Sequence, residues 1–398
     1  MRISTSQIFQ RATNALLDQQ AQVSKTQLQL STGKQIVTPS DNPTASVQIL
    51  QLQQSIDVKN TYQTNIGFAQ SSLGAEDSAL SSATDLLQRI RELAVQSNSG
   101  TVSATDLHSI SQEVQQDLNG FLGLANSQDG NGNYLFSGNS TGTKPFAQSA
   151  GAFSYAGDQG QRTIQIGENR QVAITDSGYN VFQKIKNGNG TFVTSYNNAN
   201  TGSATISTGQ VINPGAWVPD TYTLTFTSPT NYEIRDSAST LITSGTYQSD
   251  AAINFNGAQV TLSGTPASGD SFTISPSTNQ DVFSTVQRLL TAMTGVATDP
   301  ASRANYSSEV NQFLVSVDNA MNNIDDVRAG IGARLNSIDN QKAANGDFIL
   351  ASQTAMSSLQ DLDYTAATST LSKQMLVLQA AQQTFVKTQN LSLFNYIQ

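Results

Sequence analysis

The sequence has no cysteine and only one histidine, His108, among its 398 residues. The absence of cysteine excludes disulfides, thiol catalysis and thiolate metal sites. A single histidine excludes a histidine cluster and argues against a histidine-dependent catalytic triad. Acidic pairs such as Asp325 and Asp326 are consecutive on an expected helix, so they point apart and suit catalysis poorly. We therefore expect no catalytic residue, no cofactor and no metal ion, and we expect that the protein is not an enzyme.

Charge is also scarce, because charged residues make up only 12% of the chain. Twenty basic residues stand against 29 acidic ones, which gives a net charge of −9. No basic stripe exists to contact phosphates, so nucleic acid and anionic membranes are not expected as partners. No apolar run is long enough to cross a bilayer. The first residues lack the apolar core of a cleavable secretory signal peptide.

Proline is missing from long stretches at both ends. None of the nine prolines lies before Pro39, between Pro43 and Pro145, or after Pro300. Proline is excluded from helix interiors, so this distribution predicts long terminal helices around a non-helical middle. The expected helices cover 4–32, 43–98, a segment from 103 or 105, 281–294, and a segment that begins at 300. The segment 39–43 is a joint, and 361–364 is a second joint in register with it if the ends pair antiparallel.

Apolar residues recur every seven positions near both ends of the chain. The two terminal seams are Phe9, Leu16, Val23 and Leu30, and then Leu371, Leu378 and Phe385. This spacing predicts a narrow apolar seam on each helix, and such a seam requires a partner helix. An isolated pair of such narrow stripes covers too little area to be stable. We therefore predict that these seven residues form an assembly seam between copies, with an internal core as the alternative.

Two wider seams lie further inside the chain, and we expect them to form the core of a helical bundle. They comprise Ile66, Leu73, Leu80, Leu87 and Ala94, and then Val310, Val317, Ile324, Ile331 and Ile338. The phase of the second seam is expected to slip near Asn345 and to resume with Phe348, Ala355 and Leu362.

The middle of the chain changes to a period of two, as in 221–227 and 258–262. This alternation, with turn residues between the runs, predicts an all-β region, with two lobes that divide near 190. The expected fold is an α+β multidomain protein, in which both chain ends build a long antiparallel coiled-coil and helical bundle with an inserted all-β domain. The expected domains are a terminal coiled coil (1–40 with 362–398), a helical bundle (41–144 with 281–361) and a β-rich surface domain (145–280).

Two motifs have a simpler and a more specific interpretation. The segment 129–133 begins like a calcium loop, but Tyr134 stands where the loop needs glycine, so a turn is favoured. Trp217 lies between two prolines, which favours a loop anchor over a platform for stacking sugars.

Several motifs, in the correct order, resemble the flagellin-like family. They are 89–97 (RIRELAVQS), 328–335 (RAGIGARL), Asp363-Tyr364 with 371–374 (LSKQ), and 378–381 (LQAA). The start MRIST, the joint PSDNP, the segment 132–138 (GNYLFSG) and the ending 391–396 (LSLFNY) are similar to the members of this family at the hook–filament junction. The resemblance covers about 1–190 and 281–398. No resemblance is seen for 190–280, which is expected to be an extra surface lobe.

The resemblance implies a structural adaptor of the bacterial flagellum. It implies a ring subunit that joins the first hook-associated protein to flagellin, with other copies of itself and a flagellar export chaperone as further partners. It also implies an extracellular location, reached through the flagellar export apparatus without a cleaved signal peptide. Arg89, Arg91 and Glu92 are either a contact to a neighbouring subunit or a solvated helix face with i,i+4 pairs. The alternatives are a filament flagellin, and a secreted adhesin or glycan-binding module that acts through the β domain.

Overall fold

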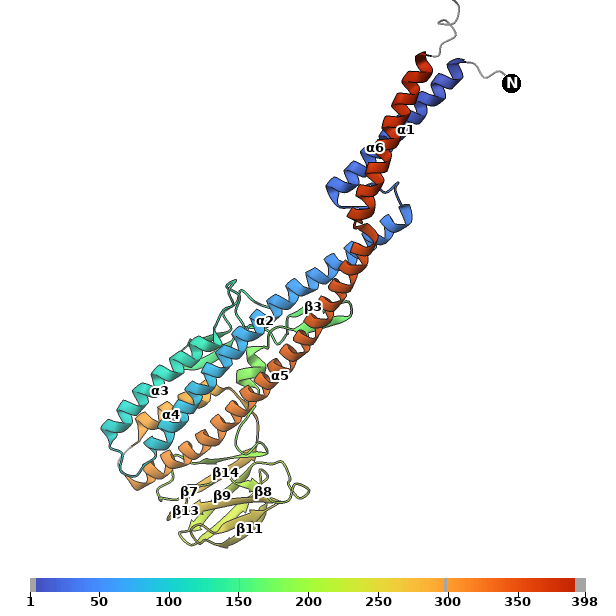
Figure 1. The fold of residues 1–398 in the computed structure, drawn as a ribbon. Coiled ribbons are helices and arrows are strands. Elements are labelled where there is room, and N and C mark those ends of the chain that lie inside the picture. Colours follow the sequence, from blue (N-terminus) through green and yellow to red (C-terminus); the bar gives the residue numbers. More distant parts are fainter. Residues whose placement is uncertain (1–4, 150, 297–298, 391–398) are drawn as a thin grey trace, which may run out of the picture. The chain divides into compact units, whose positions relative to one another are not determined.

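The computed structural model describes residues 5–149, 151–296 and 299–390. The chain divides into two compact units, residues 1–64 with 341–398 and residues 65–340. Six α-helices carry most of the described chain (Figure 1): α1 (Thr5–Thr32), α2 (Pro43–Ser97), α3 (Ala104–Ala125), α4 (Val282–Gly295), α5 (Pro300–Gln360) and α6 (Tyr364–Asn390). Helices α2 and α5 each contribute one end to the first unit and the rest to the second. The predicted fold class is confirmed, because helices from both chain ends flank an inserted all-β region.

Capping groups explain where several of these helices begin. The side chain of Asn42 accepts a hydrogen bond from the Ala45 amide at 3.1 Å, directly before Pro43 at the first position of α2. Ser103 and Asp106 form a reciprocal capping box at the start of α3. Asp281 caps α4 and Asp299 caps α5 through their side-chain oxygens. Each cap satisfies amide groups that the first turn of a helix leaves unpaired.

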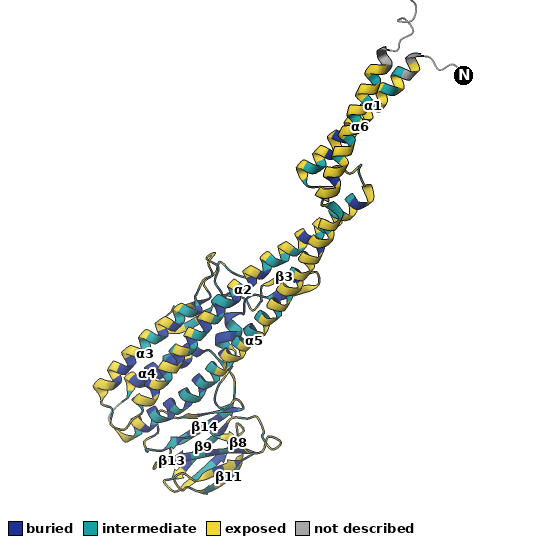
Figure 2. Cartoon of the chain, in the orientation of Figure 1, coloured by how far each residue is buried: buried dark blue, intermediate teal, exposed yellow. Residues whose placement is uncertain are grey.

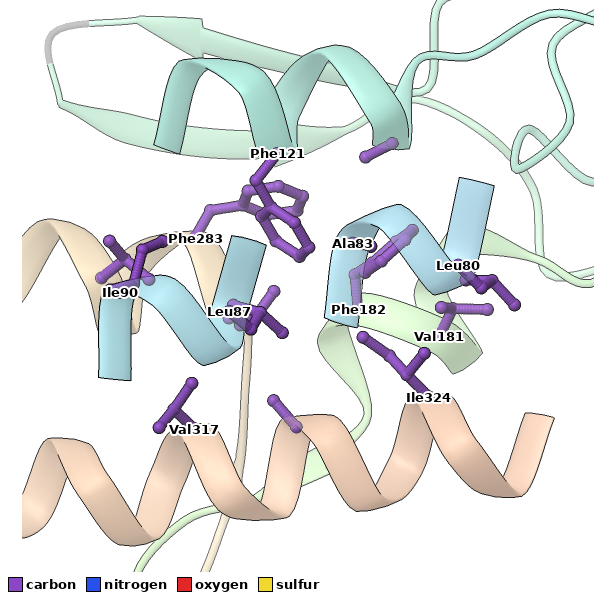
Figure 3. Close-up of a cluster of buried hydrophobic side chains, with 14 of the residues drawn as sticks. Leu80, Ala83, Leu87, Ile90, Phe121, Val181, Phe182, Phe283, Val317 and Ile324 are labelled. Carbon is purple, nitrogen blue, oxygen red and sulfur yellow. The ribbon is translucent and has the colours of Figure 1, made fainter. Parts of the chain in front are cut away.

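The second unit has a hydrophobic core between four helices (Figure 3). Leu80, Leu87 and Ile90 of α2 lie close to Val317 and Ile324 of α5 in this core. A cluster of aromatic rings continues the core towards α3 and α4, with centroids 4.9 to 5.8 Å apart: Phe121, Phe136, Phe146, Phe182 and Phe283. Both predicted inner seams are buried here from Ile66 to Ala94 and from Val310 to Ile338.

The seam on α5 does not slip near Asn345, so this part of the prediction is wrong. After Ile338 the buried positions continue at intervals of seven, with Asn345 and then Ser352. The side chain of Phe348 is 43% exposed, and Ala355 is also exposed. Because α5 is one continuous helix, its seven-residue register continues where the seam residues become polar. A search for apolar residues alone does not detect these polar seam positions.

Two hairpins and a short π-helical turn pack against the helices of the second unit. They are β1 (Phe146–Ser149) with β2 (Ala152–Tyr155), β3 (Thr163–Gly167) with β4 (Arg170–Ala173), and η1 (Tyr179–Gln183). Phe146, Ile166 and Val172 from these hairpins belong to the same core as the helices. The side-chain amide of Asn323 on α5 donates to the carbonyls of Asn180 and Val181, which fixes the turn to the helix.

The rest of the middle forms a separate lobe with its own core. Its strands are β6 (Phe192–Tyr196), β7 (Thr205–Ile206), β8 (Gln210–Val211), β9 (Tyr222–Ser228), β10 (Asn231–Arg235), β11 (Leu241–Thr246), β12 (Ala252–Phe255), β13 (Ala258–Ser263) and β14 (Ser271–Pro276). One antiparallel sheet has the order β11-β10-β9-β14-β6, and the other has β12-β13-β7, with β8 also paired to β13. Alternate residues of β9, β13 and β14 point into the shared core, as the period of two predicts.

A two-stranded pair, β5 (Ile185–Lys186) with β15 (Asn279–Gln280), connects this lobe to the helices. The side-chain amide of Asn319 on α5 donates to the carbonyls of Lys186 and Gly188, both at 2.9 Å. The two-lobe expectation therefore corresponds to two hairpins packed on the bundle core and one lobe with a core of its own. The boundaries of the three predicted domains stay a prediction. The compact units of the structure divide between 64 and 65 and between 340 and 341.

Candidate assembly interface

The seven residues of the predicted assembly seam lie between α1 and α6 of the same chain. The rings of Phe9 and Phe385 meet edge to face with their centroids 6.1 Å apart. Because both helices step by seven residues, this contact places Leu16 level with Leu378 and Val23 level with Leu371. Val23 is buried, and the other six seam residues are partly exposed. In a single chain these residues form an internal seam, and their contact with other copies stays a prediction.

Polar side chains fix the register of α1 and α6. The side-chain amide of Gln19 donates to the carbonyl of Gln374 at 3.2 Å. The buried hydroxyl of Thr26 lies 2.8 Å from the side-chain oxygen of the same glutamine. Polar groups inside a narrow seam restrict which register two helices can adopt.

The two predicted joints meet differently from the expectation. The segment 361–364 pairs with 33–35 rather than with 39–43, since the Gln35 amide donates to the Gln360 carbonyl at 2.7 Å and the Leu362 amide donates to the Gly33 carbonyl at 3.0 Å. Gly33 ends α1 with a φ of 68°. Its conformation favours glycine, and a Cβ atom there would lie 2.8 Å from the hydroxyl of Tyr364.

Asp41 organises the first joint. Its carboxylate accepts hydrogen bonds from the amides of Val37 and Thr38 and lies 2.7 Å from the ammonium group of Lys25 on α1. The hydrogen bond from Lys25, together with those from the two amides, holds the pKa of Asp41 well below its usual range. The joint is thus tied to α1 through one carboxylate.

Much of α1 and α6 is exposed (Figure 2), and the first unit exposes an unusual number of large apolar side chains. Of the seventeen large apolar side chains that are exposed in the described part of the chain, twelve lie in this unit, which is less than a third of the sequence. They are Leu17, Leu28, Val47, Leu50, Val58, Phe348, Leu350, Tyr364, Met375, Leu376, Val377 and Val386. Exposed apolar residues that gather in this way mark interaction surfaces.

None of these twelve outward residues belongs to the predicted assembly seam. Leu17 directly follows Leu16 and is 59% exposed, while Leu376 precedes Leu378 by two positions and is 68% exposed. Successive helical residues differ in direction by about 100°, so these side chains point away from the seam. A search for leucine, methionine and valine outside the seam positions would have identified Leu17 and Leu376 from the sequence.

Arg89, Arg91 and Glu92, the predicted subunit contact, take part in ion pairs within the chain. Arg89 lies 2.6 Å from Glu113 of α3 and 3.3 Å from Glu92. Arg91 lies 2.7 Å from Asp318 of α5. Two of the pairs connect α2 to neighbouring helices, and none of the three has the i,i+4 spacing that the alternative expected. A contact with a neighbouring subunit stays a prediction.

The second arginine motif acts in the same way. Arg328 lies 2.9 Å from Asp77 of α2. Arg334 forms an ion pair with Asp176, and its guanidinium also donates to the carbonyl of Ala173. The motif residues therefore connect α5 to α2 and to the segment that follows β4.

The two remaining candidates are structural. The carboxylate of Asp129 accepts hydrogen bonds from the backbone amides of Asn131 and Asn133. The segment is therefore a turn whose carboxylate is satisfied by the backbone of the turn itself. The ring of Trp217 packs between Phe192 and Tyr222, with centroids 5.2 and 5.8 Å away. Both observations agree with the simpler interpretations, a turn and a loop anchor.

Comparison with known proteins matches both helical ends of this chain to flagellins. The model of the bacterial flagellin N-terminal helical region matches residues 3–141, and that of the C-terminal helical region matches residues 314–397. Flagellar hook-associated protein 3 of Escherichia coli K12 is 25% identical over 395 residues, 99% of each chain. The crystal structure of the flagellar junction protein FlgL from Legionella pneumophila is 34% identical, with a TM-score of 0.72, and the match covers 79% of this chain and 99% of that one.

The chain belongs to the family of flagellar hook-associated protein 3, or FlgL. A second solved member, FlgL from Xanthomonas campestris, is 33% identical with a TM-score of 0.74, and the match covers 77% of this chain and 99% of that one. The flagellin-like resemblance is thereby confirmed.

The comparisons correct one expectation about the β lobe. Residues 195–276 match the D2-like domain of flagellar hook-associated protein 1, so the lobe does have relatives. Its strands are short and its sequence is polar, which left no motif that the sequence alone revealed. In the described part of the chain, no helix is long and apolar enough to cross a membrane.

Proposed function

We propose that the protein is a structural adaptor of the flagellum, a ring subunit at the hook–filament junction that joins the first hook-associated protein to flagellin. The observation that carries this proposal is the apolar surface of the first unit, in a chain whose match to a flagellar junction protein covers 99% of that solved chain. Helices that pair through one seam and expose leucine and valine on their other faces are suited to packing among further helices. These apolar faces would pack against other copies of this chain, and against the helical ends of flagellin and of the first hook-associated protein.

The same surface supports the proposed route of assembly. Exposed leucine, methionine and valine side chains on α6 would promote aggregation before assembly. A flagellar export chaperone that covers them would keep the chain soluble until it leaves the cell unfolded through the export apparatus, without a cleaved signal peptide. The protein then folds and assembles outside the cell.

Two adjacent residues of α1 test the proposal. Leu17→Asp changes a side chain that is already exposed in the single chain, so α1 and α6 should remain paired. In the ring the same aspartate would be buried without a partner, which costs several kcal/mol per subunit. Cells with this variant should export it, lack filaments and release unassembled flagellin into the medium. Circular dichroism of the purified variant should match that of the wild type.

Leu16→Asp and Gln382→Asp are the matched controls. Leu16→Asp places a charge in the internal seam, so it should weaken α1–α6 pairing in the isolated chain, which hydrogen exchange would detect. Gln382 is an exposed polar residue of α6, so Gln382→Asp should be mild. Motile Leu17→Asp cells with normal filaments would contradict the proposed contact. Immuno-electron microscopy that finds the protein along whole filaments would favour the filament flagellin alternative.

A further inference from the structure

The turn 129–133 lies outside the proposed assembly surface and contains an asparagine that is followed by a glycine. Six such pairs occur in the chain, and four of them lie outside the α-helices: Asn131-Gly132, Asn187-Gly188, Asn189-Gly190 and Asn256-Gly257. Asparagine is chemically labile, and a following glycine favours the reaction, because glycine has no side chain to keep its backbone nitrogen from the asparagine carbonyl carbon. The attack also needs an asparagine side chain that is free to turn, so the contacts of each side chain determine which pair reacts.

The side chains of Asn187 and Asn189 are held at both of their polar atoms. Oδ1 of Asn187 accepts a hydrogen bond from the Thr278 amide at 2.9 Å, and its Nδ2 donates to the hydroxyl of the same residue at 3.4 Å. Oδ1 of Asn189 accepts from the Phe192 amide at 2.9 Å, and its Nδ2 donates to the Gly209 carbonyl at 3.2 Å. Each side chain must give up these hydrogen bonds before its carbonyl carbon can reach the next backbone nitrogen, so both are protected.

The side chain of Asn256 is held by one hydrogen bond. Its Nδ2 donates to the hydroxyl of Tyr222 at 3.0 Å, and Tyr222 is buried in the core of the lobe. The carbonyl of Gly257 in the same turn accepts hydrogen bonds from the amides of Ile212 and Asn213, so the backbone of the turn is fixed as well. Asn256 is therefore also protected, but by fewer contacts than the previous two side chains.

Asn131 is the exception among the four. It is exposed, and its side chain makes no hydrogen bond to the described residues. The turn holds only its backbone, since the Asn131 amide donates to the Asp129 carboxylate at 2.9 Å. The Gly132 amide donates to the Asp129 carbonyl at 3.0 Å, but this hydrogen bond lies in an exposed turn, where local opening takes little free energy. Nothing lies within 4 Å of the position of a Cβ atom on Gly132, so its nitrogen can be approached.

We propose that Asn131 is a site of spontaneous deamidation. The nitrogen of Gly132 forms a bond to Cγ of Asn131, and its proton passes through water to Nδ2. The bond from Cγ to Nδ2 breaks, and Nδ2 leaves as ammonia. The resulting succinimide ring adds one water molecule at either of its carbonyl carbons, which gives aspartate or isoaspartate at position 131. Water is the only other reactant, and the proposal does not depend on the junction function.

The product should loosen the turn. Both products carry a carboxylate, which would lie close to that of Asp129 and be repelled by it. Isoaspartate also adds one carbon atom to the backbone of a turn that is closed by the hydrogen bond from the Asp129 amide to the Asn133 carbonyl at 2.8 Å. We therefore expect the Asn133 amide, which donates to the Asp129 carboxylate, to exchange its hydrogen faster after deamidation.

Peptide mapping by mass spectrometry of the full chain, incubated in its folded state at mildly alkaline pH, tests the proposal. Asn189 is the matched control within the chain, because both asparagines stand in the tripeptide Gly-Asn-Gly. The peptide with Asn131 should gain the mass of an amide-to-acid conversion roughly fivefold faster than that with Asn256, which must break one hydrogen bond, and faster still than that with Asn189. In urea the two Gly-Asn-Gly sites should react at equal rates.

Equal rates of Asn131 and Asn189 in the folded chain would overturn the proposal. An Asn131 that stays intact in the folded chain, over the time in which it reacts in urea, would also overturn it.

Two variants connect the reaction to these contacts. Tyr222→Phe removes the hydroxyl that holds Asn256, so deamidation at Asn256 should become roughly fivefold faster while the rate at Asn131 stays the same. Unchanged reactivity of Asn256, in a variant whose circular dichroism matches the wild type, would show that side-chain hydrogen bonds do not control the reaction, and the assignment to Asn131 would fall with it. Asn131→Gln disfavours closure of the ring, so exchange of the Asn133 amide should stay slow throughout the incubation. Equal loosening of the turn in this variant and the wild type would mean that deamidation is not its cause.

Discussion

At the scale of single residues, the most consequential group in the second unit is a buried carboxyl on α2. Glu76 is fully buried and accepts a hydrogen bond from the Asp176 amide at 2.9 Å. Its other oxygen has no partner among the described residues. Burial, and next the negative charge of Asp176, raise the pKa of Glu76 well above its ordinary value. Glu76 therefore keeps its proton at pH values at which an exposed glutamate has lost it.

This raised pKa predicts a pH dependence of stability with a definite sign. Below the unfolded pKa, near 4.5, Glu76 is protonated in both states and the folded unit has its full stability. As pH rises through the raised folded pKa, the unfolded chain releases its proton more readily, so the free energy of unfolding falls. Each pKa unit of difference corresponds to about 1.4 kcal/mol. Glu76→Gln should remove this loss, so urea unfolding should show the variant gaining on the wild type between pH 4.5 and 8.

An exposed glutamate of the same helix serves as the control. Glu92→Gln removes a charge that lies on the surface of α2 and pairs with Arg89. It should change stability by less than about 1 kcal/mol. A constant difference between Glu76→Gln and the wild type across the pH range would show that Glu76 does not titrate as argued.

At the scale of elements, the joint between α1 and α6 depends on one glycine. Gly33→Ala combines a left-handed backbone with a Cβ atom 2.8 Å from the Tyr364 hydroxyl. The strained conformation alone costs about 1–3 kcal/mol. We expect the pairing of 33–35 with 360–362 to weaken, which would appear as faster hydrogen exchange of the Gln35 and Leu362 amides.

Gly67→Ala is the matched control for this prediction. Gly67 lies within α2, its φ is not positive, and nothing lies within 4 Å of the position of a Cβ atom. Alanine has the higher helix propensity, so this variant should be stabilised by up to about 1 kcal/mol. Slow exchange of the Gln35 amide in Gly33→Ala would mean that the joint tolerates the strain.

Elements with strong local signals were predictable from the sequence. Asn42-Pro43, Ser103 and Asp299-Pro300 carry the capping chemistry that begins α2, α3 and α5, and the structure has helices at each. The buried positions Asn345 and Ser352 were missed, because a seam is usually searched for apolar residues and these are polar. The outward Leu17 and Leu376 were also missed, since a seven-residue repeat identifies only the face that pairs within the chain.

At the scale of the whole molecule, the change of period from seven to two indicated the β region but not which core each set of strands completes. Phe146 and Val172 lie in strands, yet they complete the core of the helical bundle. Phe192 and Phe272 lie in similar strands but in the separate core of the lobe. Strand patterns report which face of a strand is buried and not what buries it, so only the fold distinguishes these two sets. For the same reason, the pattern of a single chain does not reveal which contacts form in the assembled ring.

The separate core predicts that the lobe can be removed without loss of the junction. A two-residue Asn-Gly turn in place of 188–277 would keep Lys186 paired with Asn279, and Asn-Gly is the preferred chemistry for a tight hairpin. The helical core loses none of its own residues, because its side chains and those of the lobe form distinct clusters. On α5 the removal gives up the hydrogen bonds of Gln312 with Thr194 and of Asn319 with the Gly188 carbonyl. The amide of Gln312 is buried, so the shortened chain should carry Gln312→Ser to avoid an unpaired amide.

The shortened chain should keep the thermal midpoint of its helical unit within a few degrees, and its cells should remain motile, since the proposed assembly surface lies in the first unit. A control chain with Gln312→Ser alone separates the effect of that residue from removal of the lobe. Normal export of the shortened chain by non-motile cells would show that the lobe takes part in the junction, and the surface on α1 and α6 would then be only part of the interface.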